Sequence, residues 1–165
     1  MEHEYAYVGS HEIREQAYAP IDRFHPRSAQ QLLQWMARQS VKRATFTYVV
    51  ALDGRLLLSG RGTEHVSLAQ GANVRGAGEI SLEVHGNIVQ VTSVTNQSTG
   101  YCPEPACWPH VKTALEAVGI DSPDGFTHEF HFRRCTRCHT INLLKSEFPD
   151  CPVCGEQLPE QWNLR

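Results

Sequence analysis

The stretch ATFTYVVALDGRLLLSG, residues 44–60, decides the fold of this chain. It is rich in β-branched and aromatic residues, which favour strands. At its centre lies Asp53-Gly54, a pair that suits the positive φ angles of a tight turn. The pattern predicts a β-hairpin with one strand on each side of that turn.

A second hairpin is expected around His85-Gly86-Asn87. GEISLEV (78–84) precedes this turn, and NIVQVTSV (87–94) follows it. Apolar and polar residues alternate in the second segment, so successive side chains point to opposite faces, as in a half-buried strand. Together the two hairpins predict an antiparallel sheet.

Two helices are expected to flank this sheet. Ser28 can cap the first, with Gln31 completing a capping box. Its apolar face repeats at helical spacing through Leu32, Leu33, Trp35 and Met36. Pro109 suits the first turn of the second helix, which runs through residues 111–118 and ends at Gly119. The predicted fold class is therefore α+β.

Three regions follow one another along the chain. Residues 1–26 are polar and end near prolines, which predicts an irregular arm with a short helix from Ser10. Residues 27–125 hold the α+β core. Residues 126–165 begin with FTHEFHFRR, whose alternating phenylalanines predict a strand, and continue into two Cys-x-x-Cys pairs. We expect this last region to pack on the core.

The composition is that of a globular protein. Hydrophobic residues make up 41% of the 165 and charged residues 20%, which excludes wholesale disorder. No apolar run is long enough to cross a bilayer, and the acidic start MEHEYAYVGS lacks the features of a signal peptide. We therefore expect a cytoplasmic protein with no membrane partner. Six cysteines in a reducing compartment indicate metal before disulfides.

Charge is arranged in blocks beneath a net charge of −3. Residues 23–75 carry eight bases and two acids, whereas residues 1–22 and 76–125 are acidic. The eight bases are Arg23, Arg27, Arg38, Lys42, Arg43, Arg55, Arg61 and Arg75. They could attract a polyanion if they shared a face. The sequence pI of about 6.3 is far below that of typical nucleic-acid-binding domains, so solvated charges are the favoured interpretation.

Two cysteine pairs form the strongest motif in the chain. They are Cys135-Thr-Arg-Cys138 and, after twelve residues, Cys151-Pro-Val-Cys154-Gly155. Two residues between cysteines let both thiolates turn toward one metal ion from a tight loop. The motif resembles a zinc ribbon, with a second pair like that of rubredoxin-like sites. The resemblance implies one structural Zn²⁺ per chain, because four cysteine ligands leave no coordination position for a substrate. Iron bound by four thiolates is the alternative.

Basic residues surround the first cysteine pair. Arg133, Arg134 and Arg137 could contact phosphate or an acidic protein surface, although acids nearby almost cancel their charge. His139 follows Cys138 directly and is interpreted as a surface or supporting histidine, with replacement of Cys138 as a ligand the alternative.

A second motif occupies residues 65–80, HVSLAQGANVRGAGEI, and 94–105, VTNQSTGYCPEP. It resembles a module of bacterial proteins, including toxin-like ones, and of plant calmodulin-binding proteins. The matching positions are His65, Ser67, Gly71, Val74, Ala77, Gly78, Glu79, Ile80, Asn96, Ser98, Tyr101 and Pro103. The module usually has a histidine within the STGYCP segment, and this chain has none there. The whole chain resembles a bacterial family of uncharacterised function, and the resemblance implies no reaction.

Polar residues near this motif are the candidates for a second site. If the chain is an enzyme, the candidate catalytic residues are His65, Glu79, Cys102 and His110. Cys102 and Cys107, with His110 and either His65 or His85, could also bind a second metal ion. The alternative is a pair of buried thiols on a proline-rich turn.

Two classes of function remain open from the sequence. The favoured one is a zinc-stabilised binding or regulatory protein that recognises another protein, or nucleic acid, through the ribbon and the adjoining sheet. The competing class is a small enzyme or toxin-related effector with a pocket around His65, Glu79, Tyr101 and Cys102. An enzyme requires His65 and Glu79 to converge on a cavity with perturbed pKa values.

Overall fold

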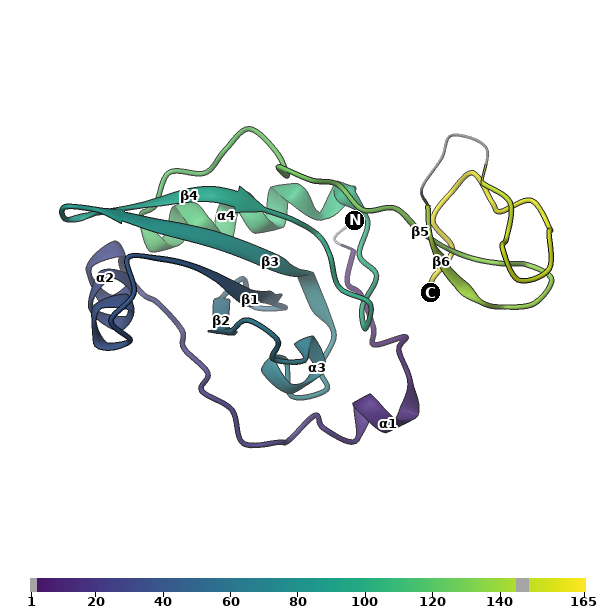
Figure 1. The fold of residues 1–165 in the computed structure, drawn as a ribbon, viewed down its shortest axis with the longest axis horizontal. Coiled ribbons are helices and arrows are strands. Elements are labelled where there is room, and N and C mark those ends of the chain that lie inside the picture. Colours follow the sequence, from purple (N-terminus) through teal and green to yellow (C-terminus); the bar gives the residue numbers. More distant parts are fainter. Residues whose placement is uncertain (1–2, 145–148) are drawn as a thin grey trace.

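The computed structural model describes residues 3–144 and 149–165, and shows an α+β core followed by a small ribbon (Figure 1). The strands of the core sheet are β1 (Arg43–Ala51), β2 (Leu56–Gly60), β3 (Val74–His85) and β4 (Ile88–Val94). The helical elements are α1 (His11–Arg14), α2 (Ala29–Arg38), α3 (His65–Leu68), η1 (Pro105–Cys107) and α4 (Trp108–Val118). In the ribbon, β5 (Phe132–Arg134) pairs with β6 (Ile141–Leu143).

Both expected hairpins are present, and the antiparallel α+β fold is confirmed. The core sheet has the order β2-β1-β3-β4, so β1 and β3 join the two hairpins at the centre. Gly54 has a φ of 89°, and the Asp53 carboxylate accepts a hydrogen bond from the backbone N–H of Arg55 at 3.1 Å. Gly86, with a φ of 63°, closes the β3–β4 turn.

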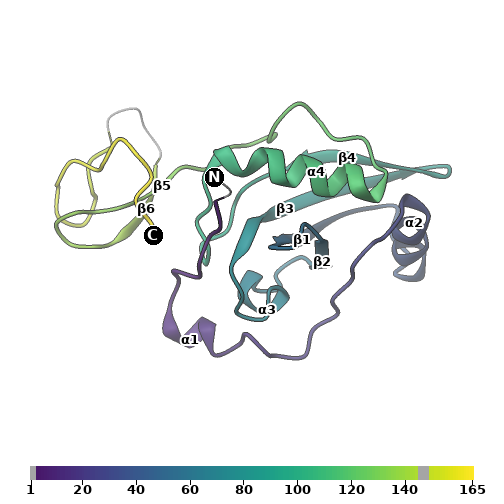
Figure 2. The same cartoon turned by 180° about the vertical axis from the view of Figure 1, so that it is seen from behind.

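The two faces of the sheet have different neighbours (Figure 2). α4 covers the face that carries Phe46, Tyr48 and Val50, all of which are fully buried. α3 lies against part of the opposite face, where Val49 of β1 and Leu57 of β2 pair across the sheet. Among the described residues, no helix combines the length and apolar character needed to cross a bilayer.

The start of α2 follows the predicted cap with one difference. The Ser28 hydroxyl accepts a hydrogen bond from the Gln31 N–H at 3.1 Å. The Gln31 side chain, however, accepts from the backbone N–H of Arg27 at 3.0 Å instead of from that of Ser28. Trp35 on the buried face of the helix stacks on Phe24, with ring centroids 4.8 Å apart.

The N-terminal arm is fixed to the core at both ends. Tyr5 exchanges two backbone hydrogen bonds with Val74, and Phe24 exchanges two with Leu58 on β2. Between these contacts α1 begins after Ser10, where the short helix was expected. The arm is irregular, as predicted, and it also extends the edges of the sheet.

The strand predicted over residues 126–134 is shorter than expected, because only Phe132–Arg134 form a strand. Upstream, the N–H of Thr127 donates to the carbonyl of Val94 at 2.8 Å, and its hydroxyl accepts from the N–H of Val94 at 3.0 Å. This segment therefore lies on the edge of β4. The alternation of phenylalanines was misleading because the chain leaves one sheet before it begins the next.

Gly78 allows a close approach that no side chain could fit. A Cβ atom at this position would lie 2.0 Å from the carbonyl oxygen of Thr95. We expect Gly78→Ala to lower the free energy of unfolding by at least about 2 kcal/mol, because backbone atoms must move apart. Chemical denaturation of the metal-loaded protein measures this loss.

Gly60→Ala is the matched control for this substitution. Gly60 ends β2, and a Cβ there would have no neighbour within 4 Å. Its effect should stay within about 1 kcal/mol. Equal effects of the two substitutions would show that the contact with Thr95 does not limit the packing of β3.

Candidate metal centre

The four cysteines of the two pairs come together in the ribbon. The Sγ atoms of Cys135, Cys138, Cys151 and Cys154 all lie within 4.8 Å of one another. Cys135 and Cys154 are 3.5 Å apart at sulfur, as are Cys138 and Cys151. Four thiolates converging from two loops suit a tetrahedral metal ion. The predicted zinc-ribbon-like cluster is thus confirmed, and it could hold a metal ion.

The two cysteine loops have the same backbone hydrogen bonds. In the first, the N–H of Cys135 donates to the carbonyl of Thr140, and the N–H of His139 donates to that of Cys135. In the second loop, the N–H of Cys151 donates to the carbonyl of Glu156, and the N–H of Gly155 donates to that of Cys151. The repeated geometry brings each cysteine pair to the metal position in the same way.

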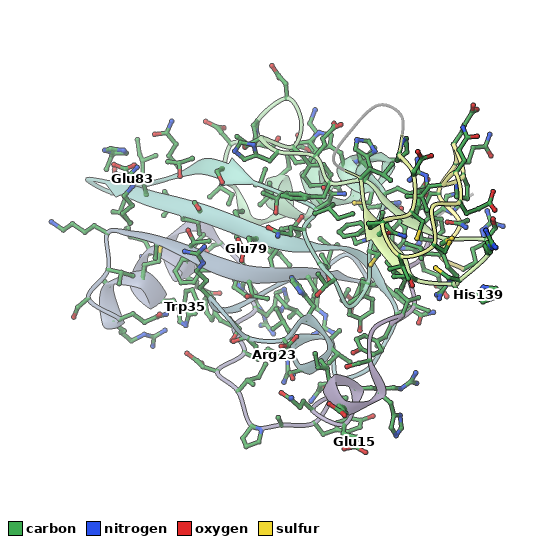
Figure 3. The ribbon with its side chains drawn as sticks, turned by 45° about the vertical axis from the view of Figure 1, so that its right-hand side comes forward. Glu15, Arg23, Trp35, Glu79, Glu83 and His139 are labelled. Carbon is green, nitrogen blue, oxygen red and sulfur yellow. The ribbon has the colours of Figure 1, made fainter. Side chains whose placement is uncertain are left out.

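His139 occupies the position in the first loop that Gly155 has in the second. Both residues adopt a left-handed backbone, with φ of 63° for His139 and 80° for Gly155. The histidine side chain is exposed at the outer end of the ribbon (Figure 3). The four-thiol cluster does not include it, so the interpretation of His139 as a surface residue is confirmed.

Hydrogen bonds help this cluster to hold thiolates. The Cys138 sulfur shares a hydrogen bond of 3.2 Å with the hydroxyl of Thr140, which together with the Thr140 backbone lowers the pKa of Cys138 to about 6. At Cys154 the backbone bond to Glu156 lowers the pKa, but burial and the bonds to the other three thiols raise it, and the net value is about 11. Adjacent thiols cannot all ionise unless a cation balances them.

The arginines beside the first cysteine pair are engaged within the ribbon. The guanidinium of Arg133 donates to the carbonyls of Pro159 and Glu160 at 3.1 and 2.8 Å. Arg134 donates to the carbonyl of His139 at 3.3 Å. These two side chains therefore position backbone, which leaves less of their donor capacity for phosphate.

Cys102 and Cys107 do not join a metal cluster among the described residues. Cys107 lies in the main core, and Cys102 lies in a separate cluster with Phe132 and Leu164. Burial raises the pKa of both thiols to about 12. At this pKa the thiolate population is negligible near neutral pH, so neither thiol is prepared to act as a nucleophile.

His65 and Glu79 line one depression, but the other candidate site residues, Tyr101, Cys102 and His110, do not line it. Both line a shallow depression of about 190 Å³ with Thr47, Thr63, Gln97 and Thr99. Figure 3 shows Glu79 on β3, at the centre of the sheet. The Tyr101 hydroxyl instead donates to the carbonyl of Ala72 at 2.7 Å, and the Cys102 sulfur lies 3.4 Å from the carbonyl of Thr99. His110 is at the start of α4 and does not line the depression.

The other motif residues hold backbone in place. The Ser67 hydroxyl donates to the carbonyl of Gln16 at 2.7 Å, and the Ser98 hydroxyl accepts from the N–H of Tyr101 at 3.2 Å. The motif therefore stabilises the connections between α3, β3 and the segment after β4.

Asn96 and Trp162 connect the ribbon to the core. The Asn96 amide accepts from the N–H of Phe130 at 2.7 Å, and donates to the carbonyls of Phe130 and Pro103 at 2.8 and 2.9 Å. The Trp162 indole donates to the carbonyl of Cys102 at 2.8 Å and meets the ring of Tyr5 edge-on. Sequence reasoning named Asn96 only as a position of the second motif, without this role, and it missed Trp162, for which the two apolar residues of the Trp-Asn-Leu segment in a polar tail were a signal.

His65 makes stability depend on pH. Its Nε2 donates to the carbonyl of Gly78 at 2.9 Å, and burial of the ring lowers its pKa below 6.5. The unfolded chain therefore binds a proton near pH 6.5 that folded His65 does not bind. The contribution of neutral His65 to the free energy of unfolding is therefore complete above pH 6.5 and is lost as the pH falls through the lowered pKa of the folded state.

We expect His65→Gln to reduce the loss of stability between pH 7 and pH 5, because glutamine binds no proton in this range. Denaturation of the metal-loaded proteins at several pH values measures the difference from wild type. Parallel curves for wild type and His65→Gln would disprove the assignment.

Comparisons with known proteins give no relative from which a function could be transferred. No family model matches the chain, and no curated protein or solved structure matches it either. The resemblance of residues 65–105 to a toxin-like module has no support from these comparisons. The four-cysteine cluster and its surroundings are therefore the observations from which a function has to be inferred.

Proposed function

We propose that this chain is a zinc-stabilised binding protein that recognises another protein through its C-terminal ribbon and the adjoining sheet. The observation that carries the proposal is the closed cluster of four thiols. Four protein ligands complete a tetrahedral shell, so the metal supports the shape of a surface and has no position for a substrate. Zinc fits this donor set, as does iron in a minority of comparable sites.

Exposed apolar side chains on the ribbon support a protein partner. Val153, inside the second cysteine pair, is 66% exposed, and Leu143 on β6 is 37% exposed. A metal-bound loop presents such side chains rigidly, which lowers the entropic cost of binding. Aliphatic groups gain more from a protein surface than from the phosphates of a nucleic acid.

Charge also favours a protein over nucleic acid. The net charge is −3, and the guanidinium groups of Arg133 and Arg134 bond to backbone carbonyls. A reducing compartment, as in the cytoplasm, would keep all six cysteines as the free thiols that the structure contains. A catalytic role gains less support, because Nε2 of His65 is engaged by Gly78 and both buried thiols have raised pKa values.

Metal analysis tests the structural part of this proposal. We expect about one zinc ion per chain in purified protein, without the visible absorption of an iron–thiolate site. Cys151→Ser should lose the metal and unfold the ribbon, since metal binding of comparable sites supplies on the order of 10 kcal/mol. Cys107→Ala, which removes a core thiol, should retain the metal.

Two results would contradict a structural zinc. One is metal-free protein whose ribbon amide signals in NMR spectra are unchanged after chelation. The other is equal metal loss in the two cysteine variants, which would mean that the four-thiol cluster is not the binding site.

Partner recognition is tested by a charge placed on the ribbon. We expect Val153→Asp to abolish recovery of a stoichiometric protein partner from cells of the source organism by affinity purification. Ile88→Asp should leave recovery unchanged, because this residue, 64% exposed, lies at the β3–β4 turn, at the end of the sheet away from the ribbon (Figure 1). Both variants should retain metal and fold.

The same pair of variants separates the alternatives. Retention of the partner by Val153→Asp with loss in Ile88→Asp would place recognition on the β3–β4 hairpin. Nucleic acid that remains bound through washing and is lost in Val153→Asp would show that the partner is a nucleic acid and not a protein.

A further inference from the structure

We propose that the cleft between the β1–β2 turn and the α3–β3 connection binds a small organic anion with a flat apolar body. The cleft has a volume of about 480 Å³, within the range of small-molecule sites. It lies on the core, on the side of the sheet that α3 only partly covers, and it includes no residue of the ribbon. The site is thus independent of the proposed recognition surface.

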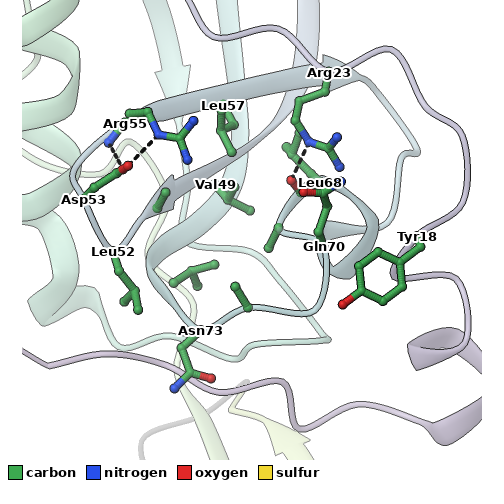
Figure 4. A pocket seen from close by; sticks show the side chains of 14 residues that line it. Tyr18, Arg23, Val49, Leu52, Asp53, Arg55, Leu57, Leu68, Gln70 and Asn73 are labelled. Carbon is green, nitrogen blue, oxygen red and sulfur yellow. Dashed lines mark hydrogen bonds and ion pairs between the residues drawn. The ribbon is translucent and has the colours of Figure 1, made fainter.

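The floor of this cleft is hydrocarbon. Val49 and Leu57 contribute from neighbouring strands, and Leu68 and Val74 contribute from the two ends of the α3–β3 connection (Figure 4). All four side chains are at least 94% buried. Ala69 and Ala72 also line the cleft, and their small side chains leave the space above the floor open. Such a floor favours the flat face of an apolar ligand.

Arg55 places a cationic group above this floor. Its Nε donates to the Asp53 carboxylate at 2.7 Å. Figure 4 shows the two terminal nitrogens directed away from Asp53 and toward Leu57. A guanidinium that is oriented by one carboxylate keeps two parallel donors for an anionic group of a ligand.

Arg23 supplies the second cation on the same rim. Its Nε donates to the carbonyl of Leu68 at 2.9 Å, and its Nη2 donates to that of Ser67. These bonds hold the guanidinium against the end of α3. With Asp53 as the one acid among the charged residues that line the cleft, the lining carries a net positive charge. This charge selects an anion over a neutral ligand.

Two exposed hydrophobic side chains border the cleft. Tyr18 is 80% exposed, and Figure 4 shows its hydroxyl directed toward the interior of the cleft. Leu52, at the β1–β2 turn on the other side, is 39% exposed. A large aromatic group left in water beside an apolar floor is typical of a surface that a ligand covers.

The location of the other bases favours a small anion over a polyanion. Arg43 pairs with Glu83 at 3.8 Å, and Arg61 pairs with Glu79 at 4.0 Å, so a carboxylate lies beside each of these two bases. The basic block of the sequence is thus divided between regions. A small ligand with one anionic group suits the cleft, where Arg55 offers its terminal nitrogens and Arg23 adds positive charge to the lining.

Binding of 2-naphthoate to the metal-loaded full chain tests this inference. In ¹H–¹⁵N NMR titrations we expect saturable shifts confined to residues 49–57 and 68–74 and to Tyr18 and Arg23. 2-Naphthamide has the same body without the charge and should bind about two- to fivefold more weakly, the scale of one exposed ion pair. Arg55→Gln should weaken naphthoate by a similar factor, and Arg43→Gln should not.

Three outcomes would overturn the proposal. They are the absence of saturable shifts at millimolar naphthoate, shifts centred outside the cleft, and equal affinity for the acid and the amide. Equal weakening by Arg55→Gln and Arg43→Gln would also overturn it, since it would reflect only the net charge of the protein. None of these results bears on the ribbon, where metal content and partner recovery are measured separately.

Discussion

The buried amide of Asn96 is the interaction on which the assembly of this protein depends. The side chain is fully buried, and its two ends bond to Phe130 and Pro103, on segments far apart in the sequence. An unsatisfied amide in this position would cost about 1–3 kcal/mol for each lost partner. The core is therefore complete only when the chain that leads into the ribbon lies against it.

Local signals predicted the elements of the core well. Asp53-Gly54 and Gly86 fix their turns through backbone conformations that few residues adopt, and Gly119 ends α4 for the same reason. Ser28 marks the start of α2 through its hydroxyl, which accepts a hydrogen bond from the Gln31 N–H. The four metal-site cysteines were equally readable, because two residues between thiols impose one loop geometry. In each case the physical constraint acts within about five residues.

Long-range contacts could not be read from the sequence. Nothing local to Asn96 indicates a bond to Phe130, and Tyr101 and Cys102 were grouped with His65 although their side chains bond elsewhere. The exposed side chain of Tyr18 and the half-buried hydrogen bonds of Arg23 belong to an arm whose residues show no regular pattern. The partners of the arginines could not be predicted either, because neighbouring residues in the sequence do not show whether a guanidinium contacts solvent or a backbone carbonyl.

The position of Phe130 has a consequence for the order of events during synthesis. Every strand of the core sheet is complete by Val94, and α4 by Val118, before any ribbon cysteine has left the ribosome. The ribbon strands have three residues each and are too short to persist alone. A nascent core would thus present the open amide of Asn96 as a docking point, and the late-arriving ribbon would be held there while its thiols collect their metal.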